Sequence, residues 1–270
     1  MSDFGAIADA FVSARRDARG LPAYPGTPPG TLADAYAIQG RAIQKMGGRV
    51  AGWKVGKIPA PLDREHGANR LAGPIFADKV VEAAGRPAMS VFADGFAAAE
   101  AEFLLRVGTA PNPDQRHFTM DEAAALIGAV HCGIEIASSP FSGINAGGPA
   151  VTVSDFGNNH GLVVGPALGE WRDAFLDWPV QLLIDGDEIG HAKASDMLDG
   201  PIGAARFLFE LLAERGIAVE PGQWISSGAV TGVHEVRPGA EVTALFGDDM
   251  KLSCTIEAAG ARSDERKAQR

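Results

Sequence analysis

Cysteine is scarce in this sequence. The two cysteines, Cys132 and Cys254, match no zinc-binding spacing and are too few for a disulfide framework, although a single bridge between them is compatible with the sequence. Such sparing use of cysteine fits a reducing compartment, and we expect a cytoplasmic protein.

Positive charge is outnumbered by negative charge. The 270 residues contain 24 Lys and Arg against 34 Asp and Glu, which gives a formal net charge of −10. Binding to nucleic acid requires clustered Lys and Arg that neutralise phosphates. The notable basic patches, Arg15-Arg16 and residues 262–270, both sit near the termini. We therefore expect no nucleic-acid partner.

Long apolar runs are also missing. The longest nearly apolar stretch, residues 123–137, contains a His and a Glu and is too short to span a bilayer. The N-terminal region carries Asp3 and Asp9 and lacks the apolar core of a signal peptide. These features predict a soluble protein with no membrane partner.

Two common catalytic motifs are absent as well. The sequence has no phosphate-cradling Gly-rich loop that ends in Lys-Ser/Thr, and it has no Gly-x-Ser-x-Gly nucleophile elbow. Both absences weaken the hypotheses of a nucleotide-binding protein and of a serine hydrolase.

The composition that is present, 46% hydrophobic and 21% charged, is that of an ordinary globular protein with one large domain or two closely packed ones. Turn and cap signals divide the chain into few helices and many short strands without an internal repeat, which indicates an α+β fold. We expect helices at residues 4–19, 31–47, 119–130 and 200–216, and strands at 49–56, 132–138, 162–164, 180–184, 188–193, 224–227, 241–246 and 252–256.

Two carboxylates, Glu100 and Glu102, stand one residue apart in the apolar run of residues 96–105. Buried ionised carboxylates cost roughly several kcal/mol unless they are paired or bound to a metal. On a helix these side chains would point about 200° apart, whereas on a strand they share one face. Local helix propensity favours the helix, and on an amphipathic helix the two glutamates would be exposed to solvent. We predict the strand, on which both glutamates are ligands of one cation.

Lys54 stands between Gly52 and Gly56 on one face of an alternating segment, residues 49–56. Glycine weakens a strand unless something must approach its backbone closely. We interpret this face as the floor of a pocket into which Lys54 points, with residues 59–69 as a mobile loop over it. A surface lysine on an edge strand is the alternative.

A third glutamate, Glu135, lies between small neighbours in the predicted strand 132–138. A lone Glu among small and apolar residues is hard to explain as a surface residue. We therefore favour a buried metal ligand over a glutamate on an edge strand. Three glutamates with a lysine offer oxygen ligands, which suit Mg²⁺ or Mn²⁺ rather than Zn²⁺.

The order of three short motifs resembles a known family. The motifs are Gly52-Trp-Lys-Val-Gly56, Ala99-Glu-Ala-Glu-Phe103 and Ile134-Glu-Ile136. They resemble the 2-hydroxypenta-2,4-dienoate hydratase and 4-oxalocrotonate decarboxylase family, within the fumarylacetoacetate hydrolase superfamily. Ala35-Tyr-Ala-Ile-Gln39 is similar to the family's N-terminal helix, and Glu220-Pro-Gly-Gln-Trp-Ile-Ser-Ser-Gly228 is similar to its C-terminal β signature.

The resemblance covers most of the chain and implies its architecture. We expect an N-terminal α/β cap region with helices at residues 1–79, and a mixed β-roll core of the fumarylacetoacetate hydrolase C-terminal-domain type at residues 80–260. The charged residues 261–270 are typical of a disordered tail. The family likeness also implies a homo-oligomer.

The same resemblance implies the site residues. Glu100, Glu102 and Glu135 would hold the metal, Mg²⁺ or Mn²⁺, and Lys54 would act catalytically at a small 2-oxo acid substrate. We also place Ser227, within the C-terminal signature, at the substrate.

Departures from the family pattern concentrate in the loops expected to contact the substrate. The usual Thr-Ser after the lysine motif is here Lys57-Ile-Pro59, and we place Lys57 at the substrate. The usual Asp-Asn-Ala-Ser is here Asp155-Phe-Gly-Asn-Asn-His160. Asp78 and His160 are the candidate catalytic proton relays, and their alternatives are a turn aspartate and a buried structural histidine.

A divalent ion chelated by a 2-oxo acid acts as a Lewis acid that stabilises an enolate. Hydration, decarboxylation and C–C hydrolysis differ only in what is added or expelled next. We expect a metal-dependent hydratase, a lyase of aromatic catabolism, acting on a short unsaturated 2-oxo or 2-hydroxy acid such as 2-hydroxypenta-2,4-dienoate. The alternatives are a decarboxylase of the 4-oxalocrotonate type, an acylpyruvate-type C–C hydrolase, and a non-catalytic partner subunit. Retention of the glutamates and Lys54 argues against the last.

Overall fold

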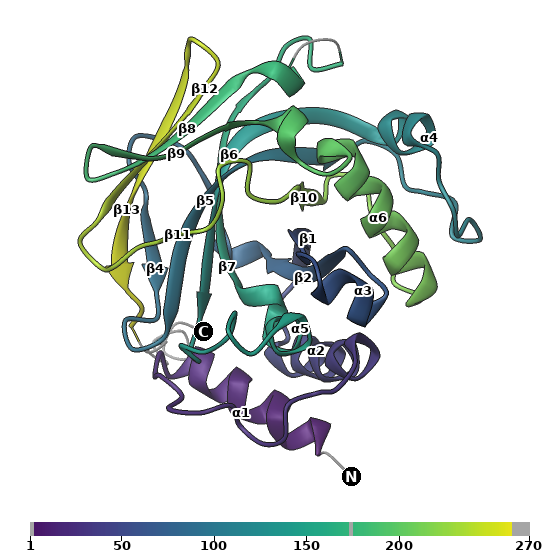
Figure 1. Cartoon of the computed structure of the whole chain (residues 1–270), viewed down its shortest axis with the longest axis vertical. Helices are drawn as coiled ribbons and strands as arrows, with labels where there is room; N and C mark the ends of the chain where they lie inside the picture. Colours follow the sequence, from purple (N-terminus) through teal and green to yellow (C-terminus); the bar gives the residue numbers. More distant parts are fainter. Residues whose placement is uncertain (1–2, 173–174, 261–270) are drawn as a thin grey trace, which may run out of the picture.

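The computed structural model describes residues 3–172 and 175–260, which form two β-sheets with helices packed around them (Figure 1). The helices are α1 (Phe4–Arg16), α2 (Leu32–Met46), α3 (Leu62–His66), α4 (Met120–Ala125), α5 (Pro149–Ser154) and α6 (Gly200–Glu214). The 3₁₀ turns are η1 (Ala77–Lys79), η2 (Phe156–Asn158), η3 (Phe175–Asp177) and η4 (Ala194–Asp196). The strands are β1 (Val50–Lys57), β2 (Arg70–Phe76), β3 (Val80–Glu82), β4 (Ala88–Val91), β5 (Phe96–Val107), β6 (Ile127–Ser139), β7 (Asn159–Ala167), β8 (Pro179–Ile184), β9 (Asp187–Lys193), β10 (Trp224–Ser226), β11 (His234–Glu235), β12 (Glu241–Phe246) and β13 (Met250–Ala258).

The larger sheet has the strand order β2-β1-β10-β5-β6-β7-β3, and β11 also pairs with β5. The smaller sheet has the order β4-β13-β12-β8-β9 and mixes parallel and antiparallel pairs. In Figure 1 the smaller sheet lies along the left and upper edge, α6 lies on the opposite side, and α1 and α2 lie together at the lower end. The α+β prediction is therefore confirmed.

The N-terminal helices form where their caps and apolar spacing predict. Thr31 caps α2 by accepting a hydrogen bond from the Asp34 amide at 3.1 Å, and Gly47 ends the helix in a left-handed conformation with φ 71°. The buried side chains Phe11 and Ile38 join a small core that also contains aromatic rings from the larger sheet and from η2. This packing fixes the two helices against the larger sheet.

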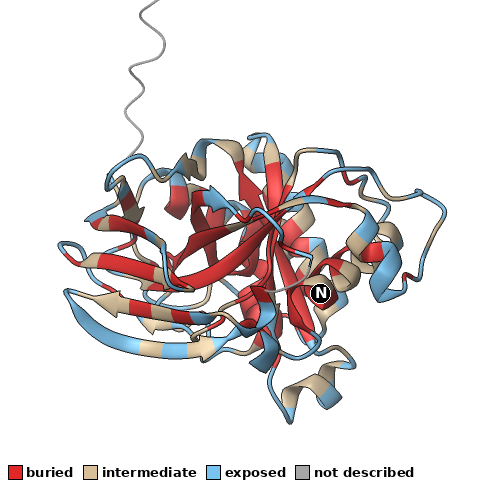
Figure 2. Ribbon diagram, turned by 90° about the horizontal axis from the view of Figure 1, so that it is seen from above, coloured by how far each residue is buried: buried red, intermediate tan, exposed pale blue. Residues whose placement is uncertain are grey.

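Alternation along β5 separates the core from the site. Phe103 packs into the main core, with its ring centroid 5.2 Å from that of Phe246 on the smaller sheet, whereas Glu100 and Glu102 occupy the other face. Figure 2 shows the same division, with buried residues concentrated in the strands and exposed residues in the loops. The strand prediction for this segment is confirmed, and the helix that local propensity favours is wrong.

Two element predictions need correction. The helix expected at residues 119–130 ends at Ala125, because the chain enters β6 at Ile127 and pairs there with Val107 of β5. The loop expected at residues 59–69 contains the short helix α3. Helix α5, whose six residues are all buried, was not predicted from the sequence.

Strands β1 and β2, from the expected N-terminal region, pair within the same sheet as β5. The boundary between residues 79 and 80 stays a prediction. The tail expected at residues 261–270 lies outside the described residues. Within the described residues, no helix has the length and apolar character needed to cross a membrane.

Candidate active site

Glu100 and Glu135 lie directly opposite each other on the antiparallel strands β5 and β6, and Glu102 lies opposite Gly133 on the same face. One carboxylate oxygen from each glutamate lies within 4.8 Å of the other two. Glu100 is 3% exposed, and the other two glutamates are 0% exposed. Register and strand alternation together therefore gather three acidic side chains inside the protein.

This cluster is electrostatically strained. Burial raises the pKa of Glu100 to about 7, opposed by the charge of Lys54 and reinforced by that of Glu135. Burial, followed by the charges of Glu135 and Glu100, holds the pKa of Glu102 well above its usual range. Oε1 of Glu102 and Oε2 of Glu135 are buried without a hydrogen-bond partner. A divalent cation would satisfy these oxygens and remove the repulsion, so the residues fit Mg²⁺ or Mn²⁺.

One oxygen of Glu102 and one oxygen of Glu135 are held by neighbouring donors. Ser226 Oγ donates a hydrogen bond to Oε2 of Glu102, and the Gly228 amide donates to the same oxygen at 3.0 Å. Asn159 Nδ2 donates to Oε1 of Glu135 at 2.8 Å. These bonds orient the carboxylates and leave their other oxygens for a ligand.

Sequence reasoning selected Ser227 and missed both Ser226 and Asn159. Strand β10 runs antiparallel to β5 with Ser226 opposite Leu104, and this register carries the Ser226 hydroxyl to the glutamate face. No local motif indicates that register. Ser227 itself is buried, lines the cavity described below, and has a hydroxyl without a hydrogen-bond partner.

Lys54 lies beside the cluster. Its Nζ is 3.5 Å from Oε2 of Glu135 and donates a hydrogen bond to Oδ1 of Asn158 at 3.2 Å. Burial by itself lowers the pKa of this amine, but the carboxylates of Glu135, Glu100 and Glu102 raise it above its usual value. Lys54 is therefore a buried cation, and the edge-strand alternative does not describe it.

The glycines around Lys54 serve packing as well as the pocket. A Cβ at Gly52 would collide with the backbone of Trp224 on β10. This glycine therefore allows β1 and β10 to approach each other, and it does not make room for a ligand. A Cβ at Gly73, opposite Lys54 on β2, would collide with the backbone of Phe156. Gly56, by contrast, lines the cavity. The interpretation of both flanking glycines as pocket floor is thus correct only for Gly56.

A cavity of about 620 Å³ opens above the cluster. Lys54 and Glu100 line it, together with the predicted substrate contacts Lys57 and Ser227. Apolar side chains and glycines form much of the remaining wall, including Val55, Leu62, Leu71, Pro149, Met197, Leu198, Gly228, Ala229, Val230 and Val233. The cavity therefore combines charged and polar groups with apolar walls.

Asp78 and His160 line a second cavity of about 330 Å³. His160 Nδ1 is 3.2 Å from Nη1 of Arg15, and its Nε2 is 3.4 Å from Oγ of Ser90. The structure thus brings the two proposed relay residues to one cavity, but not to the cavity that Lys54 lines. Their catalytic role stays a prediction.

Arg15 is a structural contributor that the sequence did not reveal. Although it belongs to a basic pair near the N-terminus, it is 7% exposed, and its Nε and Nη2 donate to the Asp155 carboxylate at 2.6 and 2.9 Å. Nη1 also donates to the backbone oxygen of Asn159 at 3.2 Å. Helix α1 is thereby tied to the segment that supplies Asn158 and Asn159 to the site.

A scan of protein-family models found no match, and a search of curated proteins also found none. Among solved structures, the chain is similar to the 4-oxalocrotonate decarboxylase from Pseudomonas putida G7 complexed with magnesium and adipate. The identity is 19%, the match covers 94% of this chain and 97% of that chain, and the TM-score is 0.78.

Two further structures extend the likeness. The fumarylpyruvate hydrolase from Pseudomonas aeruginosa, in complex with Mn²⁺ and pyruvate, has 15% identity and a TM-score of 0.57, with 78% of this chain and 91% of that chain covered. A Yersinia pestis CO92 protein assigned to the fumarylacetoacetate hydrolase family has 13% identity and a TM-score of 0.56, with 76% of this chain and 92% of that chain covered.

These likenesses establish the fold, which is the one that these three structures share and the one that the sequence resemblance implied. Within that fold, the match to the Pseudomonas putida decarboxylase includes nearly the whole chain.

Proposed function

We propose that this protein is a divalent-metal-dependent enzyme that acts on 2-oxo acids, and that its reaction is a decarboxylation of the 4-oxalocrotonate type. The observation that carries the proposal is the buried cluster of Glu100, Glu102 and Glu135, with Lys54 beside it, at a cavity of about 620 Å³. The hydratase placed first on sequence receives less support than its decarboxylase alternative, because the match that spans nearly the whole chain is to a decarboxylase.

The charges of the site support a divalent ion. Three carboxylates against one ammonium leave the fully ionised cluster with a net negative charge, and its ligand atoms are the oxygens that Mg²⁺ and Mn²⁺ prefer. Glu100, Glu102 and Glu135 would hold the ion, which, when bound, would act as a Lewis acid on the carboxylate and keto oxygens of a 2-oxo acid.

Lys54 is the residue of this chain that would act on the substrate. In the decarboxylation, the bond to the leaving carboxylate breaks, CO₂ departs, and the electron pair enters the conjugated 2-oxo system, which must later accept a proton at carbon. From its place beside the glutamates, Lys54 would supply a positive charge or a proton to the substrate. Asn158 holds the ammonium in place through its side-chain oxygen.

The substrate contacts of Lys57 and Ser227, the relay roles of Asp78 and His160, and the homo-oligomer are further parts of this proposal. Lys57 and Ser227 line the cavity, which supports their assignment.

The products formed from 2-oxohex-3-enedioate by the Mg²⁺-loaded protein test the proposal. Decarboxylation releases CO₂, hydration consumes water without CO₂, and C–C hydrolysis yields two shorter acids. We expect CO₂ release that stops with EDTA and in Glu102→Gln, and that persists in Glu257→Gln, which changes an exposed carboxylate on β13. Water uptake without CO₂ would restore the hydratase hypothesis. A reaction indifferent to EDTA would refute the metal-dependent mechanism.

A further inference from the structure

Asn145 is a side chain of the main cavity that the proposed chemistry does not use. It belongs to the loop between β6 and α5, lines the same cavity as Lys54, and is exposed to solvent. Its Oδ1 accepts a hydrogen bond from Nδ2 of Asn158 at 3.0 Å. Because Asn158 in turn accepts from Nζ of Lys54, a chain of two amides runs from the cavity wall to the ammonium.

The direction of the hydrogen bonds along this chain is fixed. An ammonium can only donate, so Asn158 must turn its amide oxygen toward Lys54 and its amide nitrogen toward Asn145. Asn145 must then accept through its own oxygen. Without that acceptor, the amide of Asn158 would be free to rotate and to turn its nitrogen toward the ammonium, where two donors would face each other. Asn145 thereby keeps the acceptor of Lys54 in place.

Asn158 is presented by a strained turn. Phe156, Gly157 and Asn158 have φ values of 57°, 61° and 59°, in the left-handed region that residues other than glycine rarely adopt. The turn lies against the stem of Lys54, since a Cβ at Gly157 would lie 3.2 Å from Cδ of Lys54. Gly73 allows this close approach of the turn to β2. Such strain persists only where the surrounding structure enforces it, and it is concentrated at functional sites.

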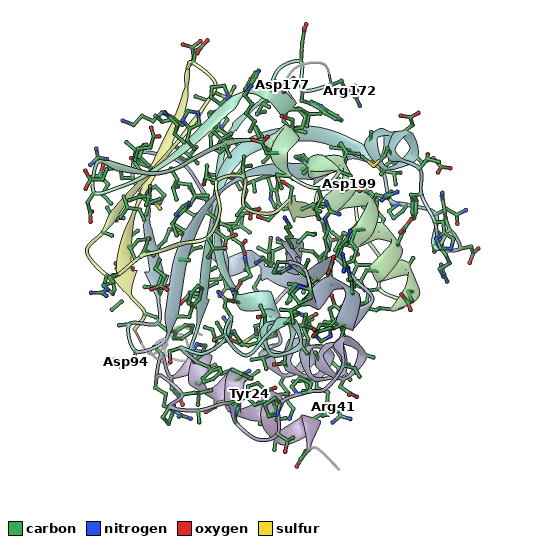
Figure 3. The ribbon with its side chains drawn as sticks, viewed as in Figure 1. Tyr24, Arg41, Asp94, Arg172, Asp177 and Asp199 are labelled. Carbon is green, nitrogen blue, oxygen red and sulfur yellow. The ribbon has the colours of Figure 1, made fainter. Side chains whose placement is uncertain are left out.

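The loop that carries Asn145 is anchored by its neighbours. Ile144, the preceding residue, is 0% exposed. Tyr24, labelled in Figure 3, places its ring centroid 6.1 Å from that of Phe141 at the start of the loop, and its hydroxyl donates to Oγ of Ser154 at 3.0 Å. Asn145 is therefore held at a defined place although it is exposed to solvent.

We propose that Asn145 is a positioning residue of the reaction, which acts through Asn158 on Lys54. Asn158 and Glu135 engage two of the three N–H bonds of the ammonium, and the third can reach a substrate in the cavity that Lys54 lines. Fixing the first two directions aims the third, and a misplacement of about 1 Å at a catalytic group can lower the rate about 100-fold. The inference rests on the proposed function, because it requires Lys54 to act on a substrate.

Steady-state CO₂ release from 2-oxohex-3-enedioate by the Mg²⁺-loaded protein tests the proposal. Asn145→Ala removes the acceptor and should lower kcat about 10-fold or more while KM stays within about threefold. Asn145→Asp keeps an acceptor oxygen at the same place and should recover most of the lost kcat. The Mg²⁺ affinity of Asn145→Ala, measured by calorimetry, should stay within about threefold of the wild type, because the hydrogen bond of Asn145 goes to Asn158 and not to a glutamate.

A double-mutant cycle makes the result specific. Asn158→Gly removes the amide, and glycine tolerates the left-handed φ. In that background Asn145→Ala should have no further effect on kcat, because the chain of amides is already broken. The control is Asn112→Ala, which removes an exposed loop asparagine whose Oδ1 accepts from the Asp114 amide at 3.0 Å. This control should keep the kcat and KM of the wild type.

Each other outcome has one meaning. If Asn145→Ala keeps the wild-type kcat, if Asn145→Asp recovers none of the loss, or if the effects of Asn145→Ala and Asn158→Gly add in full, the positioning role is refuted while the proposed function stands. If the wild type turns the substrate over without releasing CO₂, or does not turn it over, the proposed decarboxylation fails and the positioning role for it fails as well.

Discussion

Replacing Glu100 by glutamine tests the glutamate cluster without any substrate. Burial and Glu135 raise the pKa of this carboxyl from 4.5 to about 7 in the metal-free protein, against the opposing charge of Lys54. In the unfolded chain the carboxyl ionises at its ordinary pKa. The folded state therefore holds a proton that the unfolded state releases, so this group's contribution to the stability of the metal-free protein is fully present below pH 4.5 and is lost as the pH rises through about 7.

The size of this effect on the free energy of unfolding follows from the shift in the pKa of Glu100. A difference of about 2.5 pKa units at 1.36 kcal/mol per unit corresponds to about 3 kcal/mol once the group is ionised in both states, near pH 8. At pH 5 the same linkage gives about 1 kcal/mol. Glutamine keeps the shape and removes the charge. We therefore expect Glu100→Gln to be more stable than the wild type in EDTA at pH 8, by up to about 10 °C in Tm, with a smaller gap at pH 5.

Bound metal should reverse the sign of the stability difference between Glu100→Gln and the wild type. An ion that binds only the folded state stabilises it by RT ln(1 + [L]/Kd), so the wild type gains stability as Mg²⁺ or Mn²⁺ exceeds its Kd. Glu100→Gln lacks one ligand and should gain less. The difference in Tm between the two proteins should therefore shrink or change sign with saturating metal.

The assay is a set of melting curves of both proteins with EDTA and with excess Mg²⁺ or Mn²⁺, at pH 5 and pH 8. Glu257→Gln, an exposed carboxylate on β13, is the control and should follow the wild type in all conditions. If Glu100→Gln is less stable than the wild type in EDTA at pH 8 and responds fully to metal, Glu100 is an ordinary structural carboxylate and the reasoning is refuted.

Two further predictions concern the site, and one concerns the buried cysteines. Glu102→Gln should abolish turnover yet keep the far-UV circular dichroism spectrum, and full activity with Mg²⁺ would contradict its assignment as a ligand. Lys54→Met should keep metal affinity within a few-fold but lower kcat/KM by about 100-fold, the scale of a lost electrostatic or acid–base group; loss of metal binding instead would make its role structural. Burial raises the pKa of the free thiols of Cys132 and Cys254 to about 12, so native protein at pH 8 should resist iodoacetamide while unfolded protein reacts; fast labelling of the native state would contradict their burial.

The sequence carried the local information about the site. The period of two places Glu100 and Glu102 on one strand face, and the apolar residues of the same segment indicate that the strand is buried. Helix propensity favoured a helix for this segment, because alanine is the best helix former. The differences in helix propensity are small in free energy, and the pairing of β5 with β6 and the burial of Phe103 in the core outweigh them. The same competition shortened the predicted helix at residues 119–130.

The long-range contacts were beyond the sequence. Arg15 looks like part of a surface patch until the fold brings Asp155 to it, and Ser226 differs from Ser227 only through the register of β10. His160 shares a polar segment with Asn158 and Asn159, but the side chains reach different places, because His160 lines the second cavity while Asn158 contacts Lys54. Such contacts depend on which strands pair and at which residue, and no local pattern records that.

Register is therefore the property on which the whole site depends. Glu100 faces Glu135 because β5 and β6 pair at these positions, and a slip of one residue would turn one strand's glutamates toward the apolar core. The core resists this slip, since it would also expose Phe103 and Ile134, which are 0% exposed, and bury charge without partners. The apolar packing on one side of these strands thus fixes the position of the charged side chains on the other side.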